Sequence, residues 1–438
     1  MERKTYLGVS PSELDPEVRG DPIAGDRYYC RDWAKKEFDT AFVRSWHIGG
    51  MLHDLESAGD FITHTLGKES ILMVRQQDGT VKAFYNVCQH RGNLLVMSPM
   101  GGLQKFTCSY HSWQYAIDGT LTAVPDAEDY LQGNPCGKVT LAEIRCDVWG
   151  GMVWFCMDEK AKPVREWLGP IAEQLEAYQL PKMKRTIYMR VEVNCNWKII
   201  RDNFNEAYHL PTLHPELKTA IDDLYTDTVF EMYPNEHNRM VMKGCMPSGR
   251  YAFDAVPEAP LDGLLQFWEL NPDDYRGKYN EIRLAIARQR RKLGESKGYW
   301  TFKYLDDSQI VDFYHYTLFP NTTFTIGPDG MQVLRSEPHP SGDPEKCIFD
   351  HWFIAPEIIG REDIDGPAGS AKWEIADLKY GKHGDFSLGF VADQDLSICV
   401  GQQKGLRSRG FKGGYLAYQE KRVQRFHEIL NDYVNGVC

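Results

Sequence analysis

Short runs of alternating apolar and polar residues, separated by turn residues, dominate the chain between residues 41 and 160. These runs lie at 70–75, 81–87, 114–117, 139–144 and 148–157, and Asp-Gly turns occur at 78–79 and 118–119. A period of two is typical of strands with one buried face, and Asp-Gly is a common hairpin turn. The pattern predicts a small antiparallel β domain over 41–160.

The pattern changes after residue 160. Apolar residues recur at helical spacing over 167–178, and a basic helical stretch follows at 282–293, whose charges we expect on a solvated face. Alternation predicts strands at 186–193, 314–326, 331–338 and 347–355, with a hairpin turn at 327–330. The overall class is therefore α+β, with a second domain at 161–438. We expect the polar residues 1–40 to form an arm that packs with this second domain.

Composition narrows the range of partners and compartments. The chain has 438 residues and a formal net charge of −12, which argues against nucleic acid and leaves a basic redox partner open. No apolar run approaches the roughly 20 residues of a membrane span, and the first residues lack the apolar region of a signal peptide. The eleven cysteines are scattered along the chain. We therefore expect reduced thiols in a cytoplasmic protein without a membrane segment.

Two short motifs in the β domain each combine one cysteine with one histidine. They are Cys88-x-His90 and Cys108-x2-His111. Two thiolates and two imidazoles would also suit tetrahedral zinc, but zinc motifs usually group the cysteines in one pair and the histidines in another. One residue of each kind per loop is the pattern of a Rieske [2Fe–2S] cluster, in which two cysteines hold one iron and two histidines the other. The motifs therefore favour a Rieske cluster.

A second group of metal-binding residue types lies about a hundred residues later. Glu206 precedes His209 by three residues, so the two share a face of a regular helix. His209 and His214 would diverge by about 140° on such a helix, and we expect Pro211 to break it so that both imidazoles converge. Two histidines and one carboxylate from elsewhere form the facial triad of non-haem Fe(II) oxygenases. The zinc-protease motif and the second Glu-x-x-His of a di-iron site are absent from the sequence.

Together the two groups resemble the large α subunit of the aromatic-ring-hydroxylating oxygenases, which are Rieske non-haem iron oxygenases. The resemblance is carried by residues 88–92, 108–113, 118–119, 196–198 and 202–214, and it is thin over 217–310. It implies a small Rieske domain, then a catalytic domain in which helices cap an antiparallel sheet. It also implies electrons from NAD(P)H through a ferredoxin or a flavin reductase. The assembly implied is a ring, most often a homotrimer, with or without a small β subunit, in which one subunit's cluster reduces the next subunit's iron.

The resemblance places the third iron ligand on a helix near the C-terminus. Asp393 and Asp395 are two residues apart, so one of them faces the metal and the other does not. Residues 403–406 resemble the family's Gln-Arg-Gly-Leu motif, and their spacing favours Asp395.

Three further residues near the histidines are candidates by resemblance. Glu206 is expected to bridge a cluster histidine of the neighbouring subunit and its own subunit's His209. Asn203 and Tyr208 are expected to line or brace the site, with plain packing as the alternative.

The activity implied is hydroxylation of an organic, aromatic or cyclic substrate with O2. Many members carry Asp where this chain has Glu206, and Glu is similar to the choline, carnitine and glycine-betaine monooxygenases. Hydroxylation or N-demethylation of a quaternary ammonium compound is therefore the alternative. A bare Rieske electron carrier would not need the His209/His214 pair, and a zinc hydrolase is a remaining class. Aromatic residues of the variable region could line an apolar pocket, form a cation cage or pack in the core: Tyr251, Phe253, Phe267, Trp268 and Trp300.

Overall fold

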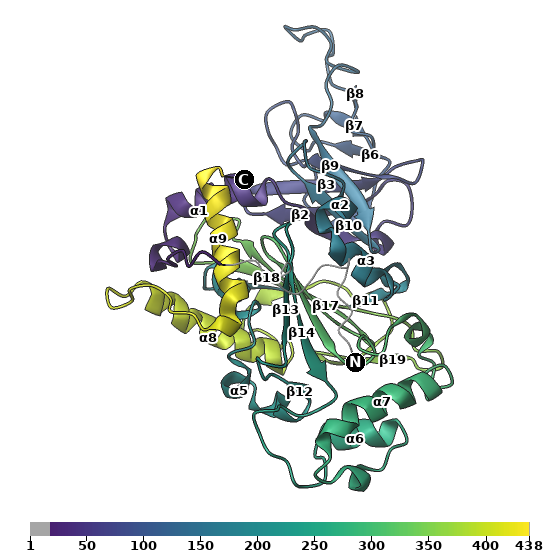
Figure 1. The fold of residues 1–438 in the computed structure, drawn as a ribbon. Coiled ribbons are helices and arrows are strands. Elements are labelled where there is room, and N and C mark those ends of the chain that lie inside the picture. The colour runs from purple at the N-terminus through teal and green to yellow at the C-terminus, as the bar shows by residue number, and fades with distance from the viewer. Residues whose placement is uncertain (1–17, 438) are drawn as a thin grey trace. The chain divides into compact units, whose positions relative to one another are not determined.

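The fold is that of a computed structural model, which describes residues 18–437 (Figure 1). It divides into two compact units, one of residues 35–167 with 338–343, and one of the remaining described residues. The expected N-terminal arm is divided between them. Residues 18–34 group with the second unit and 35–40 with the first, whereas 1–17 lie outside the described residues.

The first unit is built from antiparallel strands. A seven-stranded sheet runs in the order β1 (His47–Met51), β10 (Met152–Cys156), β9 (Glu143–Trp149), β4 (Val81–Tyr85), β3 (Glu69–Arg75), β2 (Asp60–Leu66), β5 (Met100–Gly102). A three-stranded sheet contains β6 (Lys105–Thr107), β7 (Gln114–Ala116) and β8 (Leu121–Ala123). The predicted antiparallel β domain is confirmed.

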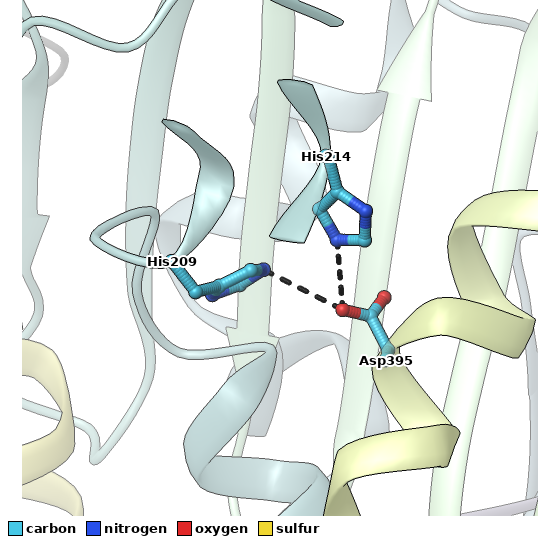
Figure 2. Close-up of side chains that lie close together, drawn as sticks. All are labelled: His209, His214 and Asp395. Atoms are coloured by element: carbon cyan, nitrogen blue, oxygen red, sulfur yellow. Dashed lines mark hydrogen bonds and ion pairs between the residues drawn. The ribbon is translucent and has the colours of Figure 1, made fainter. Parts of the chain in front are cut away.

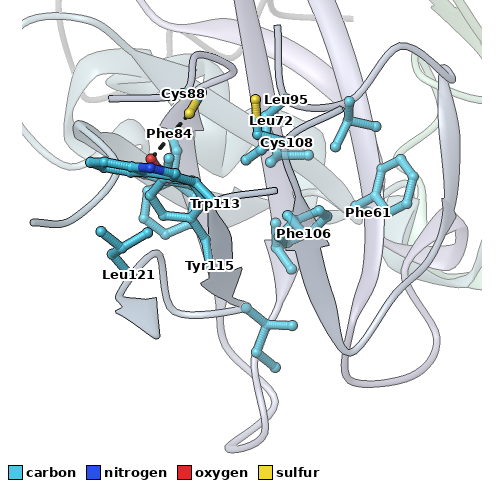
Figure 3. Packing of buried hydrophobic residues seen from close by; sticks show 14 residues of the cluster. Phe61, Leu72, Phe84, Cys88, Leu95, Phe106, Cys108, Trp113, Tyr115 and Leu121 are labelled. Carbon is cyan, nitrogen blue, oxygen red and sulfur yellow. Dashed lines mark hydrogen bonds between the residues drawn. The ribbon is translucent and has the colours of Figure 1, made fainter. Parts of the chain in front are cut away.

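A single hydrophobic cluster lies under both metal-binding motifs of this unit. Cys88 and Cys108 are themselves buried members of it, and their sulfur atoms lie at one edge of the packed side chains (Figure 3). The rest of the cluster comes mainly from aromatic and branched residues of the two sheets, including Phe84, Phe106 and Tyr115. Burial of these side chains holds the two loops in place.

The second unit is organised around a nine-stranded sheet. Its order is β12 (Ile221–Asp222), β14 (Asn238–Gly244), β15 (Phe313–Leu318), β16 (Thr322–Gly327), β17 (Gly330–Pro338), β18 (Cys347–Ala355), β11 (Lys184–Val193), β21 (Lys379–Lys382), with β13 (Val229–Met232) also on β14. β19 (Asp363–Gly366) and β20 (Gly369–Lys372) form a separate pair. The predicted hairpin at 327–330 forms, with Gly327 paired to Gly330. The stretch 314–326 is two strands, because the chain turns between Leu318 and Thr322.

Helices accompany the strands, as the α+β class predicts. Those of the second unit are α3 (Pro170–Glu176), α4 (Trp197–Asn203), α5 (Leu210–Leu213), α6 (Leu261–Phe267), α7 (Tyr279–Leu293), α8 (Phe390–Leu406) and α9 (Lys421–Asn435). Along the chain, α1 (Arg31–Glu37) and α2 (Val164–Leu168) each cross a boundary between the two units. α4 contacts both α8 and β18. The helix predicted over 167–178 is interrupted at Gly169. The φ of this residue is 56°, which is incompatible with a right-handed α-helix. None of the described helices has the length and apolar character needed to cross a membrane.

The expected solvated basic face on α7 holds for Arg288, Arg291 and Lys292, which are exposed, but not for Arg283 and Arg290. Arg283 donates to Asp312 at 2.6 Å, Arg291 donates to the Phe302 carbonyl at 2.6 Å, and Arg290 is 5% exposed. The segment 300–312 packs against this face and presents carbonyl and carboxylate oxygens to it. Arginines of this helix satisfy these acceptors, and Arg290 does so out of contact with water.

Candidate functional site

Two histidines and one aspartate meet in the second unit. The Nε2 atoms of His209 and His214 lie 3.5 and 2.9 Å from Oδ1 of Asp395, and Figure 2 shows both rings directed at this carboxylate. Among residues 18–437, this is the group of His, Cys, Asp or Glu side chains whose ligand atoms all lie within 4.8 Å of one another. The structure thus brings the sequence-predicted triad together at the spacing that one metal ion needs.

The local chain path differs from the expected one. We expected Glu206 and His209 on one helix broken by Pro211, but α4 already ends at Asn203 and the next helix begins after His209. Pro211 lies in the first turn of that helix, where its missing N–H costs nothing. The two histidines therefore flank the short α5, His209 before it and His214 after it.

The structure separates the two candidate aspartates on α8. Asp395 is 2% exposed and faces the histidines. Asp393 instead accepts hydrogen bonds from Ser387 Oγ at 2.6 Å and from the Leu388 backbone N–H at 2.9 Å, just before the helix begins. The geometry therefore favours Asp395 as the metal-facing carboxylate and gives Asp393 a capping role.

The Nδ1 atom of each imidazole forms a hydrogen bond with a side-chain oxygen. Glu206 Oε1 lies 2.6 Å from Nδ1 of His209, and Gln394 Oε1 lies 2.7 Å from Nδ1 of His214. Both Nδ1 atoms therefore donate, which leaves the Nε2 lone pairs for a metal. Sequence reasoning found Glu206 but missed Gln394, because a glutamine beside Asp395 carries no motif of its own.

The remaining predicted residues differ in how they join the site. Asn203 Nδ2 donates to Asp395 Oδ1 at 2.9 Å, which orients the carboxylate. Tyr208 donates its backbone N–H to Glu206, while its side chain is 53% exposed. Asn203 therefore braces the site directly, and Tyr208 contributes through its backbone.

The electrostatics at His214 favour a positive charge. Burial lowers the pKa of this imidazole, but the hydrogen bond and the charge of Asp395 outweigh burial, and the net pKa is raised. Groups that stabilise a proton at Nε2 also stabilise a cation there. The electrostatic environment of His214 Nε2 thus favours a bound metal cation.

The two cysteine-histidine loops of the first unit have matching backbone geometry. The N–H of Gly92 donates to the Cys88 carbonyl at 3.0 Å, and that of Ser112 donates to the Cys108 carbonyl at 2.9 Å. Gly92 and Ser112 have φ values of 74° and 58°, a conformation that glycine adopts easily. Each loop therefore presents its cysteine and histidine from the same kind of turn.

The histidines of these loops carry unused ligand atoms. The ring centroids of His90 and His111 lie 4.6 Å apart. The Nδ1 atoms of both rings are buried, and within the described chain neither has a hydrogen-bond partner. A buried polar atom without a partner is costly unless it binds something. The two Nδ1 atoms fit the iron of a Rieske cluster.

The cysteines are surrounded by hydrogen-bond donors. The Tyr115 hydroxyl lies 3.4 Å from Cys88 Sγ. Burial acts to raise the pKa of Cys108, but the backbone N–H of Tyr110 and the other nearby donors outweigh it and the pKa is lowered. Among described residues, these four side chains do not meet the 4.8 Å spacing of a single-ion group. The loops therefore suit thiolate ligands of a two-iron cluster better than one tetrahedral zinc, whose ligands lie closer together.

Comparison with known families identifies both domains. Residues 45–141 match the Rieske [2Fe–2S] domain, and residues 180–436 match the ring-hydroxylating α subunit (catalytic domain). The large oxygenase component of the naphthalene 1,2-dioxygenase system of Pseudomonas aeruginosa is 33% identical over 434 residues, covering 88% of each chain. The chloroplastic choline monooxygenase of Atriplex hortensis is 33% identical over 201 residues, 44% of this chain and 45% of that one. The chain thus matches about half the length of this curated relative.

Solved structures share the fold. The quaternary ammonium Rieske monooxygenase CntA in complex with L-carnitine superposes with a TM-score of 0.64 at 20% identity, covering 94% of this chain and 95% of that one. Naphthalene 1,2-dioxygenase with bound indole gives a TM-score of 0.66 at 19% identity, covering 95% and 93%. The resemblance inferred from the motifs is confirmed, and the family implies a Rieske cluster and a mononuclear iron. The chain belongs to the ring-hydroxylating α-subunit family and carries a Rieske domain ahead of its catalytic domain.

Proposed function

We propose that this chain is the terminal oxygenase component of a Rieske oxygenase system, which hydroxylates an organic, aromatic or cyclic substrate. The observation that carries the proposal is the presence of two separate ligand sets, one in each unit. A Rieske cluster supplies one-electron transfer, and a ferrous ion held by two histidines and a carboxylate supplies open positions for O2. A Rieske electron carrier would need only the cysteine-histidine set, and a zinc hydrolase would need only the set of two histidines and one aspartate.

Each ligand set has a defined membership in this proposal. The [2Fe–2S] cluster is held by Cys88, His90, Cys108 and His111. The Fe(II) is held by His209, His214 and Asp395. The hydrogen bonds described above keep both Nδ1 protons of the iron-binding histidines in place and hold the carboxylate in its orientation.

Glu206 is the proposed bridge to the neighbouring subunit. Its side chain is 11% exposed, and together with His209 it lines a surface cavity of about 440 Å³. The carboxylate is therefore accessible from outside while it holds His209. In an assembly it accepts a hydrogen bond from a cluster histidine of another copy, as the resemblance implies.

The distribution of charge supports a head-to-tail ring, which we take to be a homotrimer. A cavity of about 380 Å³ beside His90 and His111 is also lined by the carboxylates of Asp126 and Asp129. Exposed basic residues surround the part of α8 and the following loop that line the Glu206 cavity: Lys404, Arg407, Arg409 and Lys412. The lining of the Glu206 cavity itself carries the carboxylates of Asp202 and Glu420. The proposed docking therefore pairs the basic residues beside this cavity with the acidic cluster loops of another copy.

The electron donor and the compartment follow from the cluster chemistry. A ferredoxin or a flavin reductase delivers the electrons of NAD(P)H. Ten cysteines in the described chain are free thiols, and two of them are the proposed cluster ligands. Free thiols persist in a reducing compartment, so the proposed location is the cytoplasm.

Oxidation of a quaternary ammonium compound is the second candidate function. Glu206 and the similarity to a choline monooxygenase favour it. The aromatic residues that could have formed a cation cage fall into separate groups, however. Phe253 packs on Tyr279, Trp268 packs on Tyr299, and Trp300 packs on Tyr304. The cage is thus less well supported than an ordinary apolar pocket.

The test is O2 uptake by the purified protein with NADH and a generic ferredoxin and reductase. Aromatic acids, neutral arenes and betaines serve as substrates, with 18O2 and mass spectrometry to identify products. Substrate-dependent uptake with one or two labelled oxygen atoms in the product supports the proposal. Iron-replete protein that is reduced but incorporates no oxygen into any class contradicts it.

A further inference from the structure

A cavity of about 490 Å³ lies in the catalytic unit, apart from the surface cavity at Glu206. Neighbouring strands form its floor and α6 and α7 contribute to its wall, through Phe313, Thr325, Gln332, Phe353, Leu264 and Arg290. This volume lies in the range of pockets that hold small organic molecules.

One buried side chain joins this cavity to the iron-site segment. His315 contacts the hydroxyl of the cavity-lining Thr325 through Nδ1, at 2.7 Å. Its Nε2 lies 2.5 Å from the carbonyl oxygen of Phe204, two residues before Glu206. Thr325 and His315 are paired across β16 and β15, so they point to the same face of the sheet. The cavity and the iron site therefore share one face of the sheet, with His315 between them.

Arg290 is a buried cation in the wall of this cavity. It is 5% exposed, and Nη1 donates to the Ile310 carbonyl. Its Nε is buried and has no hydrogen-bond partner within residues 18–437. Its ion-pair partner is Asp329, which also lines the cavity; this carboxylate oxygen lies 3.7 Å from Nη2, on a hairpin turn with 47% of its side chain exposed. A buried guanidinium with an unused donor and a distant, solvated counterion favours an anionic ligand.

The other charged groups of the lining are paired. Asp312 is bound by Arg283 and by the Ser308 hydroxyl, and Asp365 forms an ion pair with Arg361 at 3.2 Å. Arg290 is therefore the one lining cation among the described residues, its pair with Asp329 is long, and the floor of the cavity is largely apolar. A planar carboxylate can take two parallel hydrogen bonds from a guanidinium, whereas an ammonium group would be repelled by it.

We propose that Arg290 binds the carboxylate of an organic-acid substrate whose apolar body lies along Phe313 and Phe353. This inference rests on the proposed oxygenase function and narrows its substrate to acids. It places the reacting end of the substrate toward His315 and the iron site, and the carboxylate at the far wall. Arg290 is then the residue that determines specificity.

Ligand affinity is measured with the anaerobic holoenzyme without reductant, so that the result does not depend on turnover. Benzoate and 2-naphthoate are compared with benzamide and 2-naphthamide, which have the same shape but no charge, and with phenyltrimethylammonium. Fluorescence reports binding, because Arg290 lies 5.6 Å from the ring of Trp268, and calorimetry checks it. The acids should bind at least ten-fold more tightly than the amides, and the ammonium compound weakest.

Variants separate recognition from folding. Arg290→Gln should abolish the preference for acids, whereas Arg288→Gln, an exposed position on the same helix, should keep it. Asp329→Asn removes the competing carboxylate and should tighten acid binding several-fold, a gain that a purely structural role does not produce. If Arg290→Gln does not fold, Arg290→Lys replaces it in the test. Lysine retains the charge but lacks the planar guanidinium, so this variant should keep part of the preference for acids.

The outcomes distinguish this inference from the proposed function. Three results would each overturn the role of Arg290. They are equal affinity of the wild type for acids and amides, a preference for acids that survives Arg290→Gln, and no gain in acid affinity with Asp329→Asn. Hydroxylation of neutral or cationic compounds alone overturns the substrate class and leaves the oxygenase function standing. Tight acid binding without any oxygenation overturns the oxygenase function and leaves the binding site standing.

Discussion

At the scale of single residues, each proposed iron ligand forms a hydrogen bond with a neighbouring side chain that fixes its orientation. Glu206, Gln394 and Asn203 each contact a different member of the triad, at 2.6, 2.7 and 2.9 Å. Such contacts select the imidazole tautomer and restrict ring rotation, and their loss typically reduces activity or metal affinity about 10–100-fold. Glu206 and Asn203 both line a surface cavity. Glu206 is the one of the three that brings a carboxylate to it, so its loss should affect more than ligand orientation.

The first prediction concerns Glu206→Gln. The amide keeps an oxygen that can accept from His209 Nδ1, so both metal centres should remain bound. Loss of the bridging charge should lower turnover at least about 10-fold. Iron content, the visible Rieske absorption and the rate of single-turnover cluster oxidation measure these effects, with the exposed Glu176→Gln as control. Full turnover by Glu206→Gln would remove the bridging role.

The residue types of both sites were predictable from the sequence, but their partners were not. Cys-x-His and Cys-x2-His specify the ligands of a Rieske cluster because the chemistry needs those types. The choice of Asp395 over Asp393 rested on a resemblance, and the structure adds the physical reason, since Asp393 is already engaged near the start of α8. Gln394 contacts a histidine 180 positions earlier, and no local pattern reveals such a contact.

At the scale of elements, turns and short helices position the ligands. The two Asp-Gly turns of the Rieske unit were predicted correctly. Glycine is favoured there because the turns require a positive φ, which is 85° at Gly79 and 90° at Gly119. Helix ends were predicted less well. The chain leaves α4 at Asn203, earlier than Pro211 suggested, and Arg283 and Arg290 of α7 bind acceptors at Asp312 and Ile310, beyond the end of the helix.

The second prediction compares alanine at the two turns. A Cβ at Gly119 would lie 2.6 Å from the Phe84 ring, whereas at Gly79 its nearest neighbour is the end of Arg75 at 3.6 Å. Gly79→Ala should cost about 1 kcal/mol through backbone strain alone. Gly119→Ala should cost about 2–4 kcal/mol, because overpacking adds to that strain. Thermal loss of the visible Rieske absorption compares them, and equal shifts would contradict the steric argument.

The third prediction concerns pH and the strand β18. Burial lowers the pKa of His351 to about 4, and its Nδ1 donates to the Leu388 carbonyl at 2.9 Å. Its folded pKa lies below the unfolded value of about 6.5, so the unfolded state binds the extra proton. The stability that this histidine contributes is complete above pH 6.5 and falls as the pH falls toward 4.

The free energy of unfolding should therefore fall more steeply for the wild type than for His351→Gln. Between pH 6 and 5 the difference in slope should be roughly 1 kcal/mol per pH unit. Urea unfolding at several pH values measures it. Parallel curves for the two proteins would show that His351 is not buried in its neutral form.

At the scale of the whole molecule, the proposed function requires two metal centres and contact between copies. The net charge of −12 argued against nucleic acid but did not reveal that carboxylates line the cavity beside the cluster loops while exposed basic residues lie at the end of α8. That arrangement depends on the fold, because the acidic loop follows β8 and the basic segment ends α8. The domain order and the α+β class, in contrast, were readable from the change in apolar period.

The fourth prediction tests the ring. Exchange of Asp126 and Asp129 for lysine should weaken the three-chain assembly, and high salt should weaken it in the wild type. Exchange of Arg407 and Arg409 for glutamate in the lysine variant should restore part of it. Sedimentation velocity resolves the species. A wild-type protein that stays a single chain at low salt contradicts the ring, and an assembly insensitive to these charges contradicts the docking faces.

The fifth prediction is the most direct test of the account, which requires a two-iron cluster and a separate mononuclear iron in each polypeptide. The measurement is the iron, zinc and sulfide content of the anaerobically reconstituted protein and of Asp395→Ala and Asp393→Ala. We expect three irons and two sulfides per chain in the wild type and in Asp393→Ala, and two irons with unchanged Rieske absorption in Asp395→Ala. Zinc in either site, fewer than three irons in the wild type, or an unchanged third iron in Asp395→Ala would contradict it.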